Sequence, residues 1–296
     1  MENPDVTMIG QVREVLDLLI DKDTFIENKV CGHSFGADFG CCAIVGTGQI
    51  DGEIATIIAN DTDAYNEKFP VVFAGIIGLE EAYKMAQAVY VTIEEDREKN
   101  VGCKRPIILI VDTPGNAPGK IEEIIGMNKA TGAYQLALAE ARSAGHPIIA
   151  VVIGRAISGA FLCHGLQADH ILALSKEFGT IIHVMPLTSI ARITKMDIEE
   201  LEEMSVSNPV FASGVNFFYK LGGIDEIIYK LEDMKSCVTN HIKMIRALKT
   251  QGNSKALGPK GRGILGVERG GRKYRAEVMK DIKEEYLAVV DRYIMA

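Results

Sequence analysis

The chain has 296 residues, of which 47% are hydrophobic and 6% aromatic, and its formal net charge is −8. This length allows one large domain or two small ones, with enough apolar sequence for a sizeable core. The negative charge argues against nucleic-acid binding. No apolar run approaches the ~20 residues that a membrane span needs, so we expect no direct membrane span. The polar, acidic start of the chain, M-E-N-P-D, is unlike a signal peptide.

The six cysteines are scattered along the chain, at positions 31, 41, 42, 103, 163 and 237. None forms C-x-x-C, and the adjacent Cys41-Cys42 is not a usual spacing for metal ligands. We therefore expect reduced thiols, a cytoplasmic protein and no metal site.

Residues 1–38 form a polar N-terminal segment, with a short helix expected around Val12, Leu16 and Ile20 and too little apolar sequence for a separate domain. Within it, Gly32-His33-Ser34-Phe35-Gly36 matches the G-x-S-x-G nucleophile elbow. Such an elbow follows several earlier strands and opens a helix. Position 34 leaves no room for those strands, so we do not predict a hydrolase.

The main domain is predicted over residues 39–250. Cys41–Val45 and Glu53–Asn60 are typical of strands, and the glycine-rich loop 46–52 between them predicts a hairpin. This loop is not a dinucleotide-binding fingerprint, because a strand follows where a helix is required. Leu79–Asn100 has helical periodicity, and Ile107–Val111 reads as a strong strand.

That strand runs into Asp112-Thr113-Pro114-Gly115, a sequence also found in GTPase switch loops. A GTPase needs in addition G-x-x-x-x-G-K-[ST] to hold phosphates, and this chain has none. Nucleotide hydrolysis is therefore excluded. Ile121–Ser143 is expected to be one long helix. Gly126 and Gly132 inside it each cost about 1 kcal/mol against Ala, which indicates close packing against another backbone.

An apolar strand over Ile148–Ile153 is followed by Ser158-Gly159-Ala160, which opens a helix. Ser158 suits an N-cap, and direct contact with a ligand is the alternative. The first N–H groups of a helix have no intrahelical partner and carry its positive dipole end. Such donors suit an oxyanion. The alternative is an ordinary strand-to-helix connection.

Two side chains near this turn have two interpretations each. Arg155 is placed to hold a carboxylate, and a surface role is the alternative. His164 follows one helical turn later. It is either a structural histidine or an acid in the pocket.

Short strands are predicted over 171–174 and 180–184. Helices are predicted over 186–193, 198–204, 211–221 and 233–250. Residues 251–275 contain seven Gly and seven Lys or Arg, which predicts a mobile basic linker. This linker is expected to bind an acidic carrier protein or a CoA-type phosphate. The alternative is a solvated tail without a binding role. Residues 276–296 carry an amphipathic helix that docks on this domain or on a partner. Repeated strand–helix pairs imply an α/β fold.

Four segments together resemble the carboxyltransferase branch of the crotonase superfamily: residues 48–61, 108–133, 146–161 and 222–228. Three strings resemble more specifically the gamma subunits of malonate decarboxylases: A-E-A-R-S-A-G-H-P, S-G-A-F-L-C-H-G-L-Q-A-D and V-M-P-L-T-S-I-A-R-I-T-K. The resemblance covers about residues 40–235. It implies a crotonase-like α/β spiral of β-β-α units with flanking helices and a C-terminal extension.

The resemblance also implies a site. Gly159 and Ala160, with Ser158 beside them, take the place of an oxyanion hole made of backbone N–H groups. Asp112, Pro114 and Gly115 form the loop next to it. With Arg155 and His164, these three residues are the expected substrate-binding set.

The activity implied is conversion of a malonyl thioester to an acetyl thioester, with the carboxyl group released or passed to biotin. The partners implied are a malonate decarboxylase beta subunit of similar fold, which shares the active site, and an acyl carrier protein with a CoA-derived prosthetic group. Any biotin is carried by another subunit. A non-catalytic scaffold that completes the pocket of the beta subunit is a further alternative.

Two departures from related patterns matter. Decarboxylase gamma subunits usually have S-G-G where this chain has Ser158-Gly159-Ala160. Ala160 keeps the backbone N–H donor, but its added Cβ is expected to narrow the approach to that donor. The sister Clp-type peptidases have A-S-x-G-A-F, which places their nucleophile at Ile157 in this chain. The sequence therefore keeps the oxyanion geometry without the nucleophile.

Overall fold

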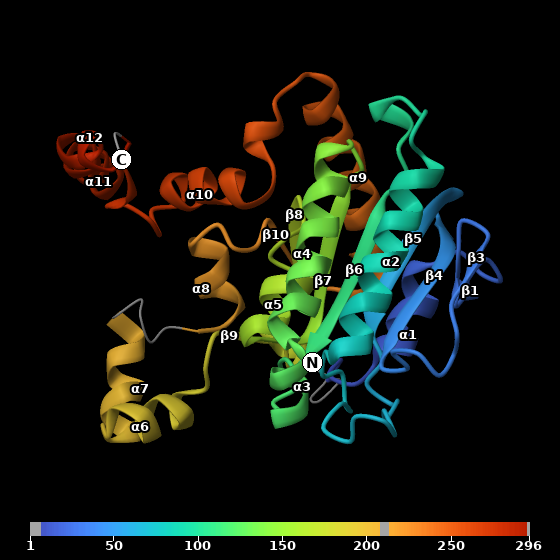
Figure 1. Ribbon diagram of the computed structural model, residues 1–296, viewed down its shortest axis with the longest axis horizontal. Helices are drawn as coiled ribbons and strands as arrows, with labels where there is room; N and C mark the ends of the chain where they lie inside the picture. Colours follow the sequence, from blue (N-terminus) through green and yellow to red (C-terminus); the bar gives the residue numbers. More distant parts are fainter. Residues whose placement is uncertain (1–6, 208–212, 295–296) are drawn as a thin grey trace.

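A mainly parallel sheet lies at the centre of the computed structural model, which describes residues 7–207 and 213–294 (Figure 1). Its strand order in these residues is β1-β4-β5-β6-β7-β8-β10, with β9 paired to β7. The strands of the sheet are β1 (Ile26–Glu27), β4 (Ala43–Ile50), β5 (Glu53–Asn60), β6 (Ile107–Thr113), β7 (Ile148–Ile157), β8 (His170–Leu174), β9 (Ile181–His183) and β10 (Glu226–Ile228). A separate pair consists of β2 (Lys29–Val30) and β3 (His33–Ser34).

Helices cover both faces of the sheet, as expected for an α/β fold. They are α1 (Val12–Leu19), α2 (Leu79–Glu95), α3 (Lys120–Ile125), α4 (Met127–Ser143), α5 (Ser158–His164), α6 (Leu187–Thr194), α7 (Ile198–Ser207), α8 (Val215–Lys220), α9 (Met234–Thr250), α10 (Gly258–Glu268), α11 (Arg275–Val289) and α12 (Asp291–Ile294). Short 3-10 turns lie at Val101–Cys103, Lys176–Phe178, Leu231–Asp233 and Ser254–Ala256. Most predicted elements are present within a few residues of their expected bounds. The start of the helix predicted over 211–221 lies outside the described residues.

The core follows from the sequence of β6. Ile107 and Leu109 belong to one apolar cluster, and Ile108 and Ile110 belong to another. Because successive side chains of a strand point to opposite faces, a continuous apolar strand is buried on both sides. Helices α2 and α4 contribute to the first cluster, and α1 and α9 contribute to the second.

The predicted hairpin is confirmed, but its turn is shorter than expected. Strand β4 continues to Ile50 and pairs antiparallel with β5 along its whole length. The turn is only Asp51-Gly52, and both residues have a left-handed φ, 54° and 77°, as two-residue hairpin turns require. Two of the three glycines that were predicted to lie in the loop, Gly46 and Gly48, lie within the strand. At Gly46 a Cβ would come within 2.6 Å of the Phe25 ring, so packing explains the missing side chain.

The single long helix predicted over 121–143 is wrong. Gly126, with φ of 121°, ends α3 and precedes α4. This region of φ favours glycine, which explains the residue. The expected close packing at Gly132 is also absent, since a Cβ built there meets nothing within 4 Å.

The basic segment 251–275 is not the mobile linker that its composition predicted. It contains α10, and its arginines donate to backbone carbonyls of the main domain. Buried Arg262 donates to the carbonyls of Ala168, at 2.7 Å, and Leu166. Arg269 donates to three more carbonyls, those of Tyr219, Ile224 and Asp225. We call residues 258–272 the strap, because they tie the end of α9 back to the sheet.

Two helical arms project from the same side of the body (Figure 1). One is the α6–α7 pair, and the other consists of α11 and α12 beyond the strap. Helix α11 has no buried residue, so the predicted amphipathic helix does not dock on its own domain. Docking on a partner stays a prediction. Within residues 7–207 and 213–294, no helix is both long enough and apolar enough to cross a bilayer.

Candidate active site

The candidate site lies where two neighbouring parallel strands end. Strands β6 and β7 pair in parallel up to Thr113 and Ala156. The carboxyl ends of parallel strands meet at one edge of a sheet. The loop after β6, with Pro114 and Gly115, therefore lies beside the turn after β7, with Gly159.

The turn after β7 is sharp. Ile157 is still extended, Ser158 has a left-handed φ of 57°, and α5 follows directly. A non-glycine residue in this conformation costs about 1–2 kcal/mol, and such strain concentrates at functional sites. Ser158 is exposed and its side chain makes no capping hydrogen bond. The N-cap prediction for Ser158 is therefore wrong, and the first N–H groups of α5 have no side-chain cap.

Gly159 and Ala160 differ in how they face solvent. Gly159 is partly exposed, whereas Ala160 is fully buried and belongs to the apolar cluster beneath α4. The Ala160 methyl group thus packs in the core. It does not narrow the exposed side of the turn, contrary to the expectation from the S-G-A sequence.

Asn116 is a site residue that the sequence analysis missed. A Cβ on Gly159 would lie 2.8 Å from the Asn116 Nδ2, so the amide lies directly against the turn. The Asn116 Oδ1 is buried and has no hydrogen-bond partner among the residues that the structure describes. Such an acceptor is costly to leave unpaired and is available to a ligand N–H. Its position two residues after the D-T-P loop was the signal in the sequence.

The structure places Asp112 beneath the site rather than at its surface. The residue is fully buried, and its Oδ1 accepts from the backbone N–H and the Nε of Arg155, at 3.0 and 2.7 Å. Its Oδ2 accepts from the Gly10 N–H at 2.6 Å. Arg155 also donates through Nη2 to the Ala74 carbonyl at 3.0 Å. Arg155 therefore holds a carboxylate, as one interpretation proposed, but the carboxylate belongs to its own chain.

His164 is likewise in the interior. It is fully buried, with its Nε2 2.9 Å from the Ile110 carbonyl and its Nδ1 2.9 Å from the Tyr134 hydroxyl. Since a carbonyl only accepts, Nε2 carries the proton and Nδ1 accepts from Tyr134. Both ring nitrogens are used inside the fold, so the structure supports the structural interpretation rather than a pocket acid.

His164 should make stability depend on pH. Burial lowers the pKa of His164 from 6.5 to about 4. Between pH 6.5 and about pH 4 the imidazole binds a proton in the unfolded chain but stays neutral in the folded chain. The free energy of unfolding therefore falls as the pH decreases through this range. The contribution of His164 to the free energy of unfolding is fully present above pH 6.5. Urea denaturation measures how much the free energy of unfolding decreases from pH 7 to pH 5. This decrease should be smaller in His164→Gln than in the wild type by about 1–2 kcal/mol.

The control for this measurement is His33→Gln, because His33 is exposed. An exposed imidazole is solvated in both states, so this variant should keep the pH dependence of the wild type. Equal losses in the wild type and His164→Gln would contradict the assignment of a buried neutral imidazole.

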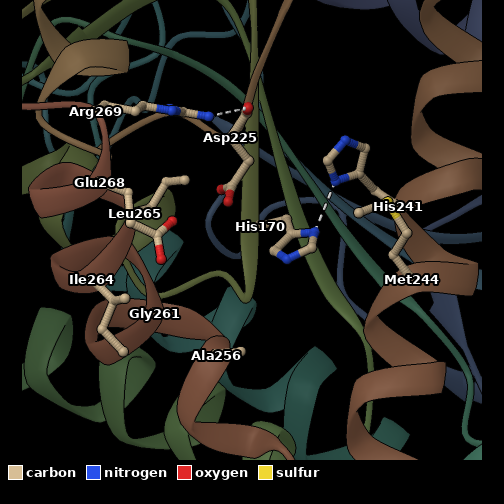
Figure 2. Close-up of a pocket in the computed structure, with 10 residues that line it drawn as sticks. All are labelled: His170, Asp225, His241, Met244, Ala256, Gly261, Ile264, Leu265, Glu268 and Arg269. Atoms are coloured by element: carbon tan, nitrogen blue, oxygen red, sulfur yellow. Dashed lines mark hydrogen bonds between the residues drawn. The ribbon is translucent and has the colours of Figure 1, made fainter.

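A separate cavity of about 310 Å³ lies at the opposite end of the sheet (Figure 2). His170 begins β8 at that end, whereas Ser158 follows the last residue of the parallel strand β7. Figure 2 shows the rings of His170 and His241 meeting through their Nδ1 atoms, 2.7 Å apart. The Arg269 guanidinium turns away to the Asp225 carbonyl. The cavity is remote from the turn, so it is not the candidate active site.

Solved structures with this architecture show the class of the protein: it has the crotonase fold of carboxyltransferase and decarboxylase subunits. A transcarboxylase 12S structure with hydrolysed methylmalonyl-coenzyme A aligns with a TM-score of 0.61 at 22% identity, over 83% of this chain and 45% of that chain. This likeness concerns the fold alone.

The chain belongs to the malonate decarboxylase gamma subunit family, whose sequence profile matches residues 74–286. It is 59% identical to the malonyl-S-ACP:biotin-protein carboxyltransferase MADD of Malonomonas rubra, over 96% of this chain and 98% of that protein. A Pseudomonas malonate decarboxylase hetero-tetramer, solved with coenzyme A, contains a similar chain. The two are 31% identical, with a TM-score of 0.70 and coverage of 82% and 91%.

Proposed function

We propose that this chain is one half of a carboxyltransferase that removes the carboxyl group from a malonyl thioester on an acyl carrier protein and passes it to a biotin protein. The observation that carries this choice is the 59% identity, over nearly the full length of both chains, to a relative named for that reaction. Biotin and the CoA-derived group of the carrier belong to other subunits in this proposal.

The chemistry requires an oxyanion to be stabilised. When the bond between the carboxyl carbon and the α-carbon breaks, its electron pair enters the thioester as an enolate. A proton on the α-carbon then gives the acetyl thioester. Biotin, when present, supplies a ureido nitrogen that accepts the carboxyl group. In this chain the N–H groups at Gly159 and Ala160 are the proposed donors to the developing negative charge, because they are fixed in place before the reaction begins.

Other residues of the site either hold its backbone in place or are proposed to contact the substrate. Asp112 fixes the backbone and side chain of Arg155, which holds the end of β7 against the loop that contains Ala74. Pro114 and Gly115 are partly exposed beside the turn and are proposed to contact substrate through the backbone. The unpaired Asn116 Oδ1 is proposed to accept a ligand N–H.

Exposed apolar side chains next to the site support a partner subunit. Ile121, Ile124 and Ile125 of α3 are all more than half exposed, and Leu162 of α5 is 48% exposed. Grouped apolar exposure of this kind marks protein interfaces. A related Pseudomonas structure is an MdcD–MdcE hetero-dimer. We propose an MdcD-like beta subunit over this face, with the active site between the two chains.

Direct release of carbon dioxide is the second candidate. It is supported by the similarity to the Pseudomonas malonate decarboxylase, although the 31% identity is lower. A scaffold role is the third candidate, and it requires the beta subunit alone to work at the full rate.

The route of the carboxyl group decides between these candidates. The complete complex is given malonyl-thioester carrier protein with a labelled carboxyl carbon. We expect the label on the biotin protein and inhibition by avidin. Label released as carbon dioxide without a biotin protein would instead establish direct decarboxylation. Full activity of the beta subunit without this chain would establish the scaffold role.

A further inference from the structure

Two adjacent cysteines and a glutamate meet beside the hairpin, outside the candidate active site. Cys41 and Cys42 lie in the turn that precedes β4, and Glu81 lies in the first turn of α2. One ligand atom from each residue lies within 4.8 Å of the other two. Adjacent side chains converge here because the backbone turns instead of running as a strand. Gly40, with φ of 56°, packs so closely on α2 that a Cβ would meet the Glu80 carbonyl at 2.8 Å.

The Glu81 carboxylate is only half satisfied. Its Oε1 accepts from the Asn66 Nδ2 at 3.0 Å and from the Cys42 N–H at 3.4 Å. Its Oε2 is buried and has no hydrogen-bond partner within residues 7–207 and 213–294, and the whole residue is 0% exposed. A buried, unpaired carboxylate oxygen costs several kcal/mol unless it gains a proton or a cation. The carboxylate would therefore be stabilised by one more positive partner.

The charges of the cluster point to a divalent ion. Lys84, one helical turn after Glu81, is also buried, and its Nζ donates to the Gly40 carbonyl at 3.2 Å. One divalent cation together with the Lys84 ammonium would balance two thiolates and one carboxylate.

We propose that Cys41, Cys42 and Glu81 bind a thiophilic divalent cation of the zinc type. Thiolate sulfur and carboxylate oxygen are zinc ligands at about 2.3 and 2.0–2.2 Å, so donors around one ion lie roughly 3.5–4 Å apart. The observed spacing needs only a small contraction. Both thiols lose their protons to solvent on binding. The fourth tetrahedral position is left for a water molecule, which the half-buried Cys41 side admits.

The ion would act on the site through the loop 61–78. Asn66 in this loop donates to the Glu81 carboxylate, which places it next to the ligands, where such partners orient metal sites. The same loop contains Ala74, whose carbonyl accepts from Arg155 at 3.0 Å. Metal binding would therefore fix a loop that supports the end of β7.

Metal content of the purified complex tests the proposal. The complex is stripped with a chelator, incubated with excess Zn²⁺ and desalted. We expect one zinc per copy of this chain in the wild type, and loss of that zinc in Cys41→Ser and Cys42→Ser. The matched control is Cys103→Ser, an exposed cysteine outside the cluster, which should keep the zinc. Zinc below stoichiometry in the wild type, or unchanged in both cluster variants, would overturn the proposal.

A spectroscopic readout on the wild type keeps the test independent of how the variants fold. Co²⁺ in place of Zn²⁺ should give thiolate-to-cobalt charge-transfer absorption together with tetrahedral ligand-field bands. Their absence from a folded, Co²⁺-loaded wild-type complex would also overturn the proposal. Zinc should in addition raise the Tm of the wild type and of Cys103→Ser, but not of Cys41→Ser. Because these measurements do not depend on turnover, a failure of the metal proposal can be distinguished from a failure of the proposed carboxyl transfer.

Discussion

Replacing Gly159 with proline should lower turnover of the reconstituted complex by about 100–1000-fold, the usual effect of losing one oxyanion donor. Proline has no backbone N–H, so the substitution removes a proposed donor. Proline is tolerated in the first turn of a helix, and Gly159 is the second residue of α5. Initial rates with malonyl-thioester carrier protein, measured on complex of unchanged subunit composition, provide the check.

Gly159→Ala separates the missing donor from added bulk. It keeps the N–H but places a Cβ 2.8 Å from the Asn116 Nδ2. We expect a smaller loss of turnover than with Gly159→Pro, because the proposed donor remains. If Gly159→Ala reduced turnover as much as Gly159→Pro, crowding and not a lost donor would explain the effect.

Asp169→Ala should lower the free energy of unfolding by about 3–5 kcal/mol, because it leaves buried positive charge without its partner. Asp169 is fully buried. It lies 2.7 Å from the Lys249 Nζ and 3.1 Å from the Arg142 Nε, and it also accepts from the Ile148 N–H at 3.1 Å. Urea denaturation of the isolated chain measures the change.

Two further variants locate the cause of this loss. Glu284→Ala removes a carboxylate from an exposed pair with Lys280 and should cost about 1 kcal/mol or less. In Asp169→Leu/Lys249→Met both partners become apolar, and we expect it to be more stable than Asp169→Ala. A double variant no more stable than Asp169→Ala would show that the lost hydrogen bonds or the unpaired Arg142, not the unpaired lysine, dominate.

Local patterns predicted much of the fold. The strand at β6, the hairpin and the turn at Ser158 were recognisable because hydrophobic runs and glycines lie next to one another in the chain. The break at Gly126 was missed, since a glycine inside a helical pattern has the same letters whether the helix continues or ends there. Only the backbone angle of 121° distinguishes the two.

The site was less accessible to sequence reasoning, because its residues meet across long separations. The resemblance indicated which loop lies beside Gly159, but not that Asp112 is fully buried or that its partner is Arg155. The residues next to His164 in the sequence do not indicate that its side chain is buried. Asn116 follows the same loop in the sequence, but its contact with Gly159 became visible only when two strand ends were placed side by side. The oxyanion role of Gly159 and Ala160 stays a prediction.

The strap also has a consequence for how the chain folds during synthesis. The carbonyls of Ala168 and Leu166 receive their Arg262 donors only after 94 and 96 further residues. A nascent chain that has emerged only to the end of α9 contains every described strand of the sheet but lacks these closing contacts. Long-range contacts of this kind form late and slowly. Roughly the last eighth of the chain to leave the ribosome therefore contains the arginines that complete a domain begun far upstream.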